Sequence, residues 1–185
     1  GTRVAFVSDQ SLHVVELDDL AAGASCVAAS AHADETWGLA EFIAAEELSR
    51  YRGHWWLPDG ASLLVERADS SAVTRWWISD PASPTREPAS VRYPSAGTAN
   101  AVVELWRVEA SGARERITWD SEALPYVATV HAGEGATLVE LLSRDQRTVS
   151  VCRVDLDACA LVELTRRTDA AWVDVMPGVP SLEGE

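Results

Sequence analysis

Short apolar segments separated by turn residues run through the whole sequence, and none shows a sustained 3.6-residue period. Segments of this kind predict strands, and their succession predicts an all-β protein. One arrangement recurs: a Gly turn, an apolar strand, a polar turn and a second apolar strand, beginning at Gly1, Gly60 and Gly135. Such repeats are typical of the antiparallel blades of a β-propeller, although a β-sandwich stays open as an alternative.

The length limits how many blades the chain can form. At about 45 residues per blade it holds roughly three to four, whereas a closed ring needs about 4 to 8. The chain is therefore either the smallest closed ring or part of a larger one. We expect residues 1–180 to form a partial β-propeller domain and residues 181–185 a loose C-terminal end. No signal peptide is visible at the start. The missing initiator Met indicates a piece of a longer protein.

The expected elements follow the turn residues. A hairpin is expected around Asp69-Ser70-Ser71, between strands at 62–68 and 73–79. Glu46 to Tyr51 fits one or two helical turns that end at Gly53. The other expected strands cover 2–8, 12–17, 26–29, 54–57, 90–93, 101–109, 114–119, 127–131, 137–143, 148–154, 160–165 and 172–176.

Charge and composition exclude several classes of function. The formal net charge is -14 and the 15 basic residues, all Arg, are scattered, which argues against nucleic-acid binding. No apolar run approaches the roughly 20 residues that span a bilayer, so no membrane partner is expected. The sequence contains no G-x-S-x-G, Walker, G-x-G-x-x-G or H-E-x-x-H motif, so we expect no catalytic residues and no cofactor in this chain.

Three cysteines, Cys26, Cys152 and Cys159, form no C-x-x-C motif, and the four His do not cluster near them, so no metal site is expected. Cys152 and Cys159 lie on the two arms of one expected hairpin and could pair, but an odd count fits a reducing compartment equally well. We therefore favour the cytoplasm over secretion.

The stretch from Ala44 to Gly60 has the composition of a site mounted on a scaffold. Glu46 and Glu47 are adjacent, and the aromatic pair Trp55-Trp56 follows, closed by a Pro-Asp-Gly turn. Two carboxylates so placed can both accept charge-assisted hydrogen bonds from one ammonium group. The plainer interpretation is a solvated helix start, where acidic side chains also favour the helix dipole. The residues alone leave both interpretations open.

The context of this stretch resembles the dipeptidyl peptidase IV family of serine exopeptidases. The resemblance rests on E-E-L-S-R-Y-R-G-H-W-W-L-P-D-G, on V-T-R-W-W-I-S-D-P and on R-Y-P-S-A-G-T-A-N, with later similarity in S-R-D-Q-R-T-V-S-V-C-R-V-D and T-D-A-A-W-V-D. It runs from Gly1 to about Pro180. Leu57 departs from the family pattern, where Ser is usual, and so does Ser95, where Lys is usual.

The resemblance implies a fold and a role. The fold is part of an eight-bladed propeller that gates access to an α/β-hydrolase domain absent from this chain. The enzyme releases N-terminal dipeptides with Pro or Ala at the second position, and Glu46 and Glu47 bind the α-ammonium group of the substrate. Without the catalytic Ser, Asp and His, this chain alone should be inactive. The hairpin with Cys152 and Cys159 is similar to one that carries a disulfide in some secreted members.

Two other hypotheses stay open. The chain could be an interaction propeller without peptidase activity, or a small closed four-bladed propeller. The expected partners are peptide N-termini, the hydrolase domain and a second copy of the chain, because exposed blade edges pair.

Overall fold

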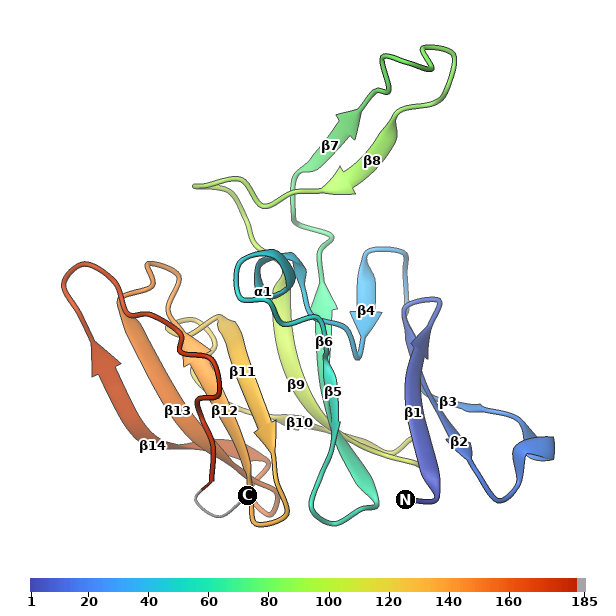
Figure 1. Cartoon of the computed structure of the whole chain (residues 1–185), viewed down its shortest axis with the longest axis vertical. Coiled ribbons are helices and arrows are strands. Elements are labelled where there is room, and N and C mark those ends of the chain that lie inside the picture. The colour runs from blue at the N-terminus through green and yellow to red at the C-terminus, as the bar shows by residue number, and fades with distance from the viewer. Residues whose placement is uncertain (183–185) are drawn as a thin grey trace.

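A computed structural model describes residues 1–182, so residues 183–185 of the expected loose end lie outside the described part. Three antiparallel sheets stand side by side like blades (Figure 1). The first contains β1 (Arg3–Ser8), β2 (Ser11–Glu16) and β3 (Ser25–Ala28). The expectation of antiparallel β-propeller blades is confirmed. The first and last sheets lie at opposite sides of the molecule, so the alternative of a closed four-bladed ring is wrong for the described residues.

The second sheet forms the centre of the molecule, and β6 is its middle strand. Along one edge β6 pairs with β9 over its full length, and along the other edge it pairs with β4 and then with β5. The strands of this sheet are β4 (Glu35–Trp37), β5 (His54–Trp56), β6 (Ser62–Asp69), β9 (Val102–Glu109) and β10 (Arg114–Ile117).

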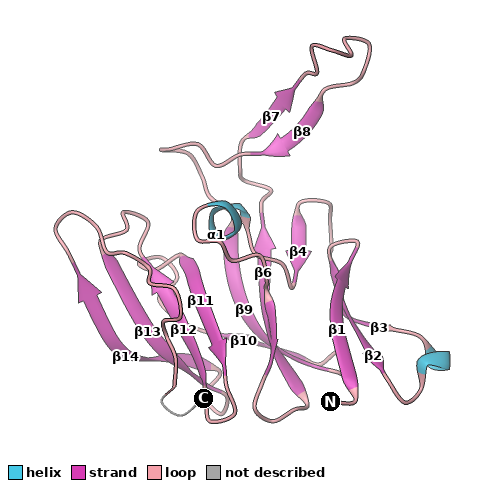
Figure 2. Ribbon diagram, viewed as in Figure 1, coloured by secondary structure: helices cyan, strands magenta, loops and turns pink. Residues whose placement is uncertain are grey.

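The third sheet is a meander in which every strand pairs with the next one along the chain. Its strands are β11 (Tyr126–Ala132), β12 (Thr137–Leu142), β13 (Thr148–Asp155) and β14 (Ala160–Thr168). Short polar turns allow this antiparallel order, as the repeated pattern predicts. Helical structure in the described part is limited to α1 (Phe42–Glu46) and one 3-10 turn (Leu20–Ala22) (Figure 2).

The core consists of apolar layers that bring the sheets together, and the Trp pair contributes to two of them. Successive side chains of a strand point to opposite faces. Trp55 is buried in the layer that contains Leu105 of the second sheet and Leu141 of the third. Trp56 packs against the layer that contains Leu12 of the first sheet. The aromatic pair is therefore a core element rather than part of an exposed site.

An arm made of β7 (Arg75–Ile78) and β8 (Ala89–Arg92) projects from the central sheet (Figure 1). The expected hairpin between strands 62–68 and 73–79 is wrong. Both edges of β6 are taken by β4, β5 and β9, so the strand after the turn pairs with β8 instead. The large side chains of the arm are exposed: Trp76, Trp77, Ile78 and Val91.

The segment 172–176 is not a strand, contrary to expectation. Val173 donates one backbone hydrogen bond to Gln146, and Val173 and Val175 pack on a cluster of the third sheet that includes Leu142. These are side-chain contacts on the face of the sheet rather than a ladder along an edge, so no strand forms.

All three cysteines are free. Cys152 lies opposite Glu163 in the ladder, whereas Cys159 lies in the turn beside Ala160, which faces Asp155. Three residues along a strand correspond to about 10 Å, and a disulfide needs Cα atoms within about 7 Å. The register therefore keeps the two thiols apart.

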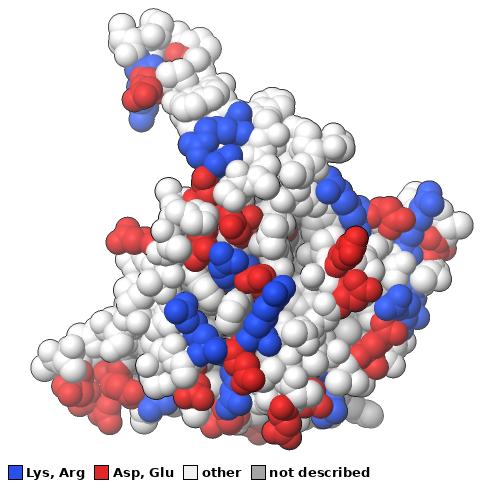
Figure 3. Space-filling model, turned by 180° about the vertical axis from the view of Figure 1, so that it is seen from behind, with Lys and Arg blue, Asp and Glu red and all other residues white. Residues whose placement is uncertain are grey.

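Charges are mixed over the surface. On the face seen from behind, arginine and acidic side chains lie next to one another rather than in separate patches (Figure 3). Arg67, for example, contacts both Glu35 and Glu104. This face therefore offers no basic stripe for phosphates. Within residues 1–182, no helix has the length and apolar character that crossing a bilayer requires.

Candidate functional site

Helix α1 begins at the carboxylate of Glu41, one turn earlier than the sequence predicted. One oxygen of Glu41 accepts from the backbone N–H of Ala44 at 2.7 Å, and the other accepts from that of Ile43 at 2.7 Å. A side chain that satisfies free N–H groups in this way fixes the start of a helix. The expected helix from Glu46 to Tyr51 is therefore wrong in position.

Glu46 and Glu47 consequently lie at the C-terminal end of α1, where Glu47 is the C-cap. Both are exposed, and within the described residues neither carboxylate makes a hydrogen bond or an ion pair. The C-terminal end of a helix carries partial negative charge, so acidic side chains are unfavourable there. The interpretation of the pair as a favourable helix start is wrong.

The chain turns back tightly after the acidic pair. Ser49 has a positive φ of 55°, and the backbone N–H of Arg50 donates to the carbonyl of Ala44 at 2.9 Å. Gly53 then passes close to the chain before the helix: a Cβ atom there would lie 2.5 Å from the carbonyl carbon of Leu39. Gly53 is therefore required by close backbone packing, whereas the sequence suggested only a helix stop.

Arg50 points away from the acidic pair and into the protein. Its guanidinium donates to Glu66 at 2.6 Å, to the carbonyl of Val127 at 2.8 Å and to the carbonyl of Arg52 at 2.7 Å. It also lies 5.8 Å from the ring centroid of Trp55. The nearest basic residue in the sequence is thus committed elsewhere, which leaves Glu46 unneutralised.

Glu66 is the buried partner of this network. Its side chain has 0% exposure. One oxygen accepts from Arg50, and the other accepts from the backbone N–H of Glu41 at 3.0 Å. Burial raises the pKa of Glu66, and the positive charge of Arg50 opposes that rise. Burial also raises the pKa of Glu41, against the two hydrogen bonds that its carboxylate accepts.

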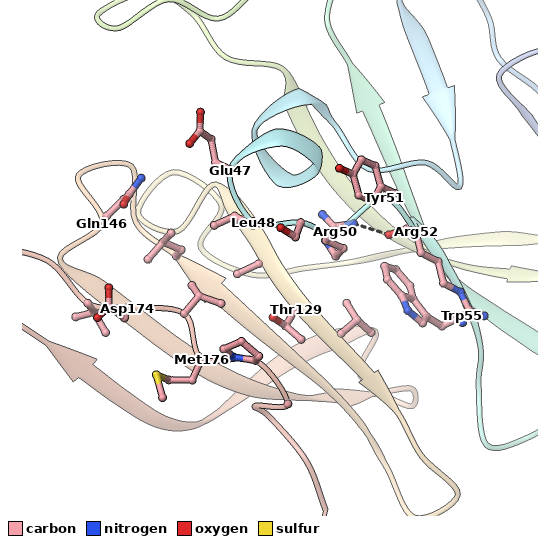
Figure 4. Close-up of a pocket in the computed structure, with 18 residues that line it drawn as sticks. Glu47, Leu48, Arg50, Tyr51, Arg52, Trp55, Thr129, Gln146, Asp174 and Met176 are labelled. Carbon is pink, nitrogen blue, oxygen red and sulfur yellow. Dashed lines mark hydrogen bonds between the residues drawn. The ribbon is translucent and has the colours of Figure 1, made fainter.

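A pocket of about 650 Å³ lies below the turn, between it, β11 and the segment 173–178. Glu47 and Tyr51 line it, but Glu46 does not. In Figure 4, Glu47 lies at the edge of the group and its carboxylate points away from Thr129 and Met176. The carboxylate of Glu47 therefore points out of the pocket, whose walls mix polar and apolar side chains.

The histidines do not join the acidic pair. The Nδ1 atom of His54 lies 2.8 Å from the carbonyl of Gly38, so this residue fixes the backbone. His32 lies 3.8 Å from Glu35 and 3.7 Å from Asp69, a grouping that could hold a metal ion. Arg67 already makes ion pairs with both carboxylates, at 2.5 and 3.9 Å. Because this cation neutralises the ligands, the residues fit a metal ion poorly.

Sequence reasoning identified Glu46 and Glu47 but missed Glu41, Arg50 and Glu66. One signal was present: Glu66 interrupts the apolar run L-L-V-E-R-A, and a charge in a buried strand needs a partner. The sequence did not indicate that the partner is Arg50, because 16 residues separate the two.

The arrangement suits the binding of a small cation. Two exposed carboxylates and the carbonyl end of a helix concentrate negative charge at Glu46 and Glu47. An ammonium group has three donors and one positive charge, so it matches two carboxylates.

Comparisons with known proteins identify the family of the chain. The family described as "Dipeptidyl peptidase IV (DPP IV) N-terminal region" matches residues 1–184. The chain is 38% identical over 72 residues to dipeptidyl peptidase 8 of Homo sapiens and, over the same length, to that of Mus musculus. Each match covers 34% of this chain and 8% of the relative.

Among solved structures, the fold is similar to that of dipeptidyl peptidase 4 from Porphyromonas gingivalis. The TM-score is 0.84 at 21% identity, and the match covers 94% of this chain but 25% of the other. The chain thus spans about a quarter of that structure's length, and the similarity at this identity concerns the fold.

Proposed function

This chain belongs to the dipeptidyl peptidase IV family, whose N-terminal region it matches, and we propose that it is the non-catalytic propeller portion of a serine exopeptidase. The whole enzyme would release N-terminal dipeptides with Pro or Ala at the second position. Its Ser, Asp and His would come from a hydrolase domain, and the propeller would gate access to them.

One observation carries the proposal: Glu46 and Glu47 are exposed, adjacent and unneutralised at the negative end of α1. In the proposed complex both carboxylates accept hydrogen bonds from the α-ammonium group of a peptide. Only a free chain end carries such a group, so this contact restricts the enzyme to exopeptidase cleavage. The substrate provides the positive charge, and the propeller provides the two carboxylates that hold the peptide end in place.

The test is made in the full-length enzyme. The variant Glu46→Gln with Glu47→Gln keeps the size of both side chains but removes their charge. Each hydrogen bond to a charged group contributes about 1.5–3 kcal/mol, so we expect KM for a dipeptidyl substrate to rise by at least about tenfold. Glu122→Gln, an exposed acid in the loop before β11, serves as the matched control. An unchanged KM in the double variant would refute the role of the pair.

A second test uses this chain alone. Incubated with an Ala-Pro or Gly-Pro chromogenic substrate, it should release no chromophore. If the chain did turn over the substrate, and a serine-directed inhibitor abolished that turnover, the assignment of the catalytic Ser, Asp and His to another domain would be wrong.

The alternative is an interaction propeller without peptidase activity. The exposed arm favours this alternative, because Trp77 and Ile78 are 63% and 56% exposed. A nucleophile motif in the sequence downstream of this chain would support the peptidase, and its absence would support the interaction propeller.

We also propose that the chain self-associates through its exposed blade edges, which light scattering tests.

A further inference from the structure

The segment that carries the acidic pair has little stability of its own. Helix α1 is five residues long, and isolated helices of that length are unstable in water. The carboxylates of Glu46 and Glu47 make no hydrogen bond or ion pair in the described part of the chain that could position them. Their location therefore depends on what fixes the backbone on either side.

A single buried carboxylate contacts both flanks of this segment. Glu66 accepts from the backbone N–H of Glu41, just before the helix, and from the guanidinium of Arg50, just after the turn. Its two oxygens are thus divided between the two ends. No other residue in the described part of the chain makes side-chain hydrogen bonds to both flanks.

Arg50 extends this connection to the third sheet. The guanidinium that contacts Glu66 in β6 also donates through Nε, at 3.1 Å, and through Nη2, at 2.8 Å, to the carbonyl of Val127 in β11. On the apolar side, Ile43 and Leu48 pack against the cluster of Tyr126 and Leu142 in the same sheet. The segment is therefore fixed relative to two blades at once.

From this geometry we infer that Glu66, acting through Arg50 and the backbone of Glu41, is a positioning residue of the ammonium site. It sets where Glu46 and Glu47 stand relative to the sheets without contacting the substrate. The inference rests on the proposed function of the acidic pair. A displacement of about 1 Å in a binding group can lower catalytic efficiency by about 100-fold.

The next residue of β6 provides a matched control. Arg67 points to the opposite face and pairs with Glu35 at 2.5 Å. The side chain of Glu35 is only 3% exposed, so the carboxylate of this ion pair is also buried, but it makes no hydrogen bond or ion pair with α1 or its flanks. Glu35→Gln therefore reproduces the loss of a buried charge without disturbing the acidic pair.

The experiment compares Glu66→Gln with Glu35→Gln in the full-length enzyme. We expect both variants to lower the melting temperature, because each removes a buried carboxylate from an ion pair. The loss should be smaller in Glu35→Gln, because Arg67 keeps its ion pair with Glu104. We expect KM for a dipeptidyl substrate to rise about tenfold in Glu66→Gln only, with kcat changed less than twofold. An equal KM in the two variants would overturn the inference.

Combining variants separates this inference from the proposed function. If Glu66 acts through the acidic pair, Glu66→Gln should not raise KM further once Glu46 and Glu47 are both Gln. A further tenfold rise in that background would show an independent effect and overturn the inference. If the double Gln variant itself leaves KM unchanged, the proposed function fails first.

Arg50→Lys provides a second route in case Glu66→Gln does not fold. A lysine keeps the charge, but its single nitrogen cannot replace the planar group in which three separate nitrogens donate to Val127, Arg52 and Glu66. We expect a well-folded variant with KM raised about threefold or more. A folded Arg50→Lys variant with unchanged KM would contradict the inference.

Discussion

Two segments project from the central sheet. Each is anchored by one carboxylate that contacts two partners. The segment with α1 lies between β4 and β5 and is anchored by Glu66, which accepts from Arg50 and Glu41. The arm lies between β6 and β9 and is anchored at its base by Asp34, which pairs with Arg75 and Arg92. The same chemical device serves both segments.

Burial distinguishes the two anchors. Glu66 is 0% exposed, whereas the side chain of Asp34 is 23% exposed. The α1 segment also packs Ala44 and Ile43 inward, while the arm leaves Trp77 exposed. An ion pair in contact with water contributes little, but breaking a buried pair leaves an uncompensated charge. The α1 segment should therefore be rigid and part of the fold, and the arm should be separable from it.

The largest expected difference in stability between the two segments concerns the loss of a tryptophan side chain. Trp55→Ala, beside the α1 segment, removes a side chain that is 6% exposed, whereas Trp77→Ala, on the arm, removes one that is 63% exposed. We expect Trp55→Ala to lower the free energy of unfolding by about 3–5 kcal/mol and Trp77→Ala to change it by less than about 0.5 kcal/mol. Urea denaturation of the two variants checks this, and similar losses would contradict the comparison.

Removal of the α1 anchor should have the next largest effect. Arg50→Met leaves Glu66 buried without its cation and should destabilise the chain by about 3 kcal/mol. Burial already raises the pKa of Glu66, and losing Arg50 raises it further. A carboxyl with a raised folded-state pKa stabilises the fold as pH falls through that pKa.

The loss in Arg50→Met should therefore be smaller at about pH 5 than at about pH 7. Urea denaturation at both values measures it. Arg52→Met, which removes an exposed arginine two residues along the chain, is the control. A loss that is independent of pH would mean that Glu66 is not left charged.

A smaller difference in stability is expected between the replacement of Gly53, beside the α1 segment, and that of Gly97, in the arm segment. A methyl group on Gly53 would meet backbone atoms of Leu39 and Gly38 at 2.5–2.7 Å, whereas one on Gly97 of the arm segment would meet nothing within 4 Å. We expect Gly53→Ala to destabilise by about 1–3 kcal/mol or more because the backbone must move. Gly97 has a positive φ of 81°, so its replacement should cost only about 1 kcal/mol of strain. Thermal unfolding distinguishes them.

The smallest effect on the whole fold is expected at the base of the arm. The hydrogen bond from Arg92 lowers the pKa of Asp34. A lowered carboxyl pKa adds stability above the unfolded-state pKa, and this contribution is lost as pH falls through the folded-state pKa. Asp34→Asn removes this contribution at neutral pH, but the contribution is small because the ion pair is in contact with water. We therefore expect only a slightly lower melting temperature at neutral pH, together with increased chymotrypsin cleavage within residues 74–94. Unchanged cleavage would show that Asp34 does not anchor the arm.

Local patterns predicted most of the sheets, because turns and strands depend on neighbouring residues. The turn at Asp59, for example, forms as expected, with one carboxylate oxygen accepting from the N–H groups of Ala61 and Ser62 at 2.9 Å. The arm was missed because strand pairing is a choice among distant partners. The pattern of residues 62–79 is that of a hairpin, and it is excluded only because β4 and β5 occupy one edge of β6 and β9 occupies the other.

The adjacent acids, the all-β class and the resemblance to an exopeptidase family follow from the order of residues alone. The tertiary structure decided that Glu46 and Glu47 lie at the end of the helix rather than at its start, and that Trp55 belongs to the core. It also decided that Glu66 reaches both flanks of α1. A buried charge requires a partner, but only the packing of distant strands determines which residue that partner is.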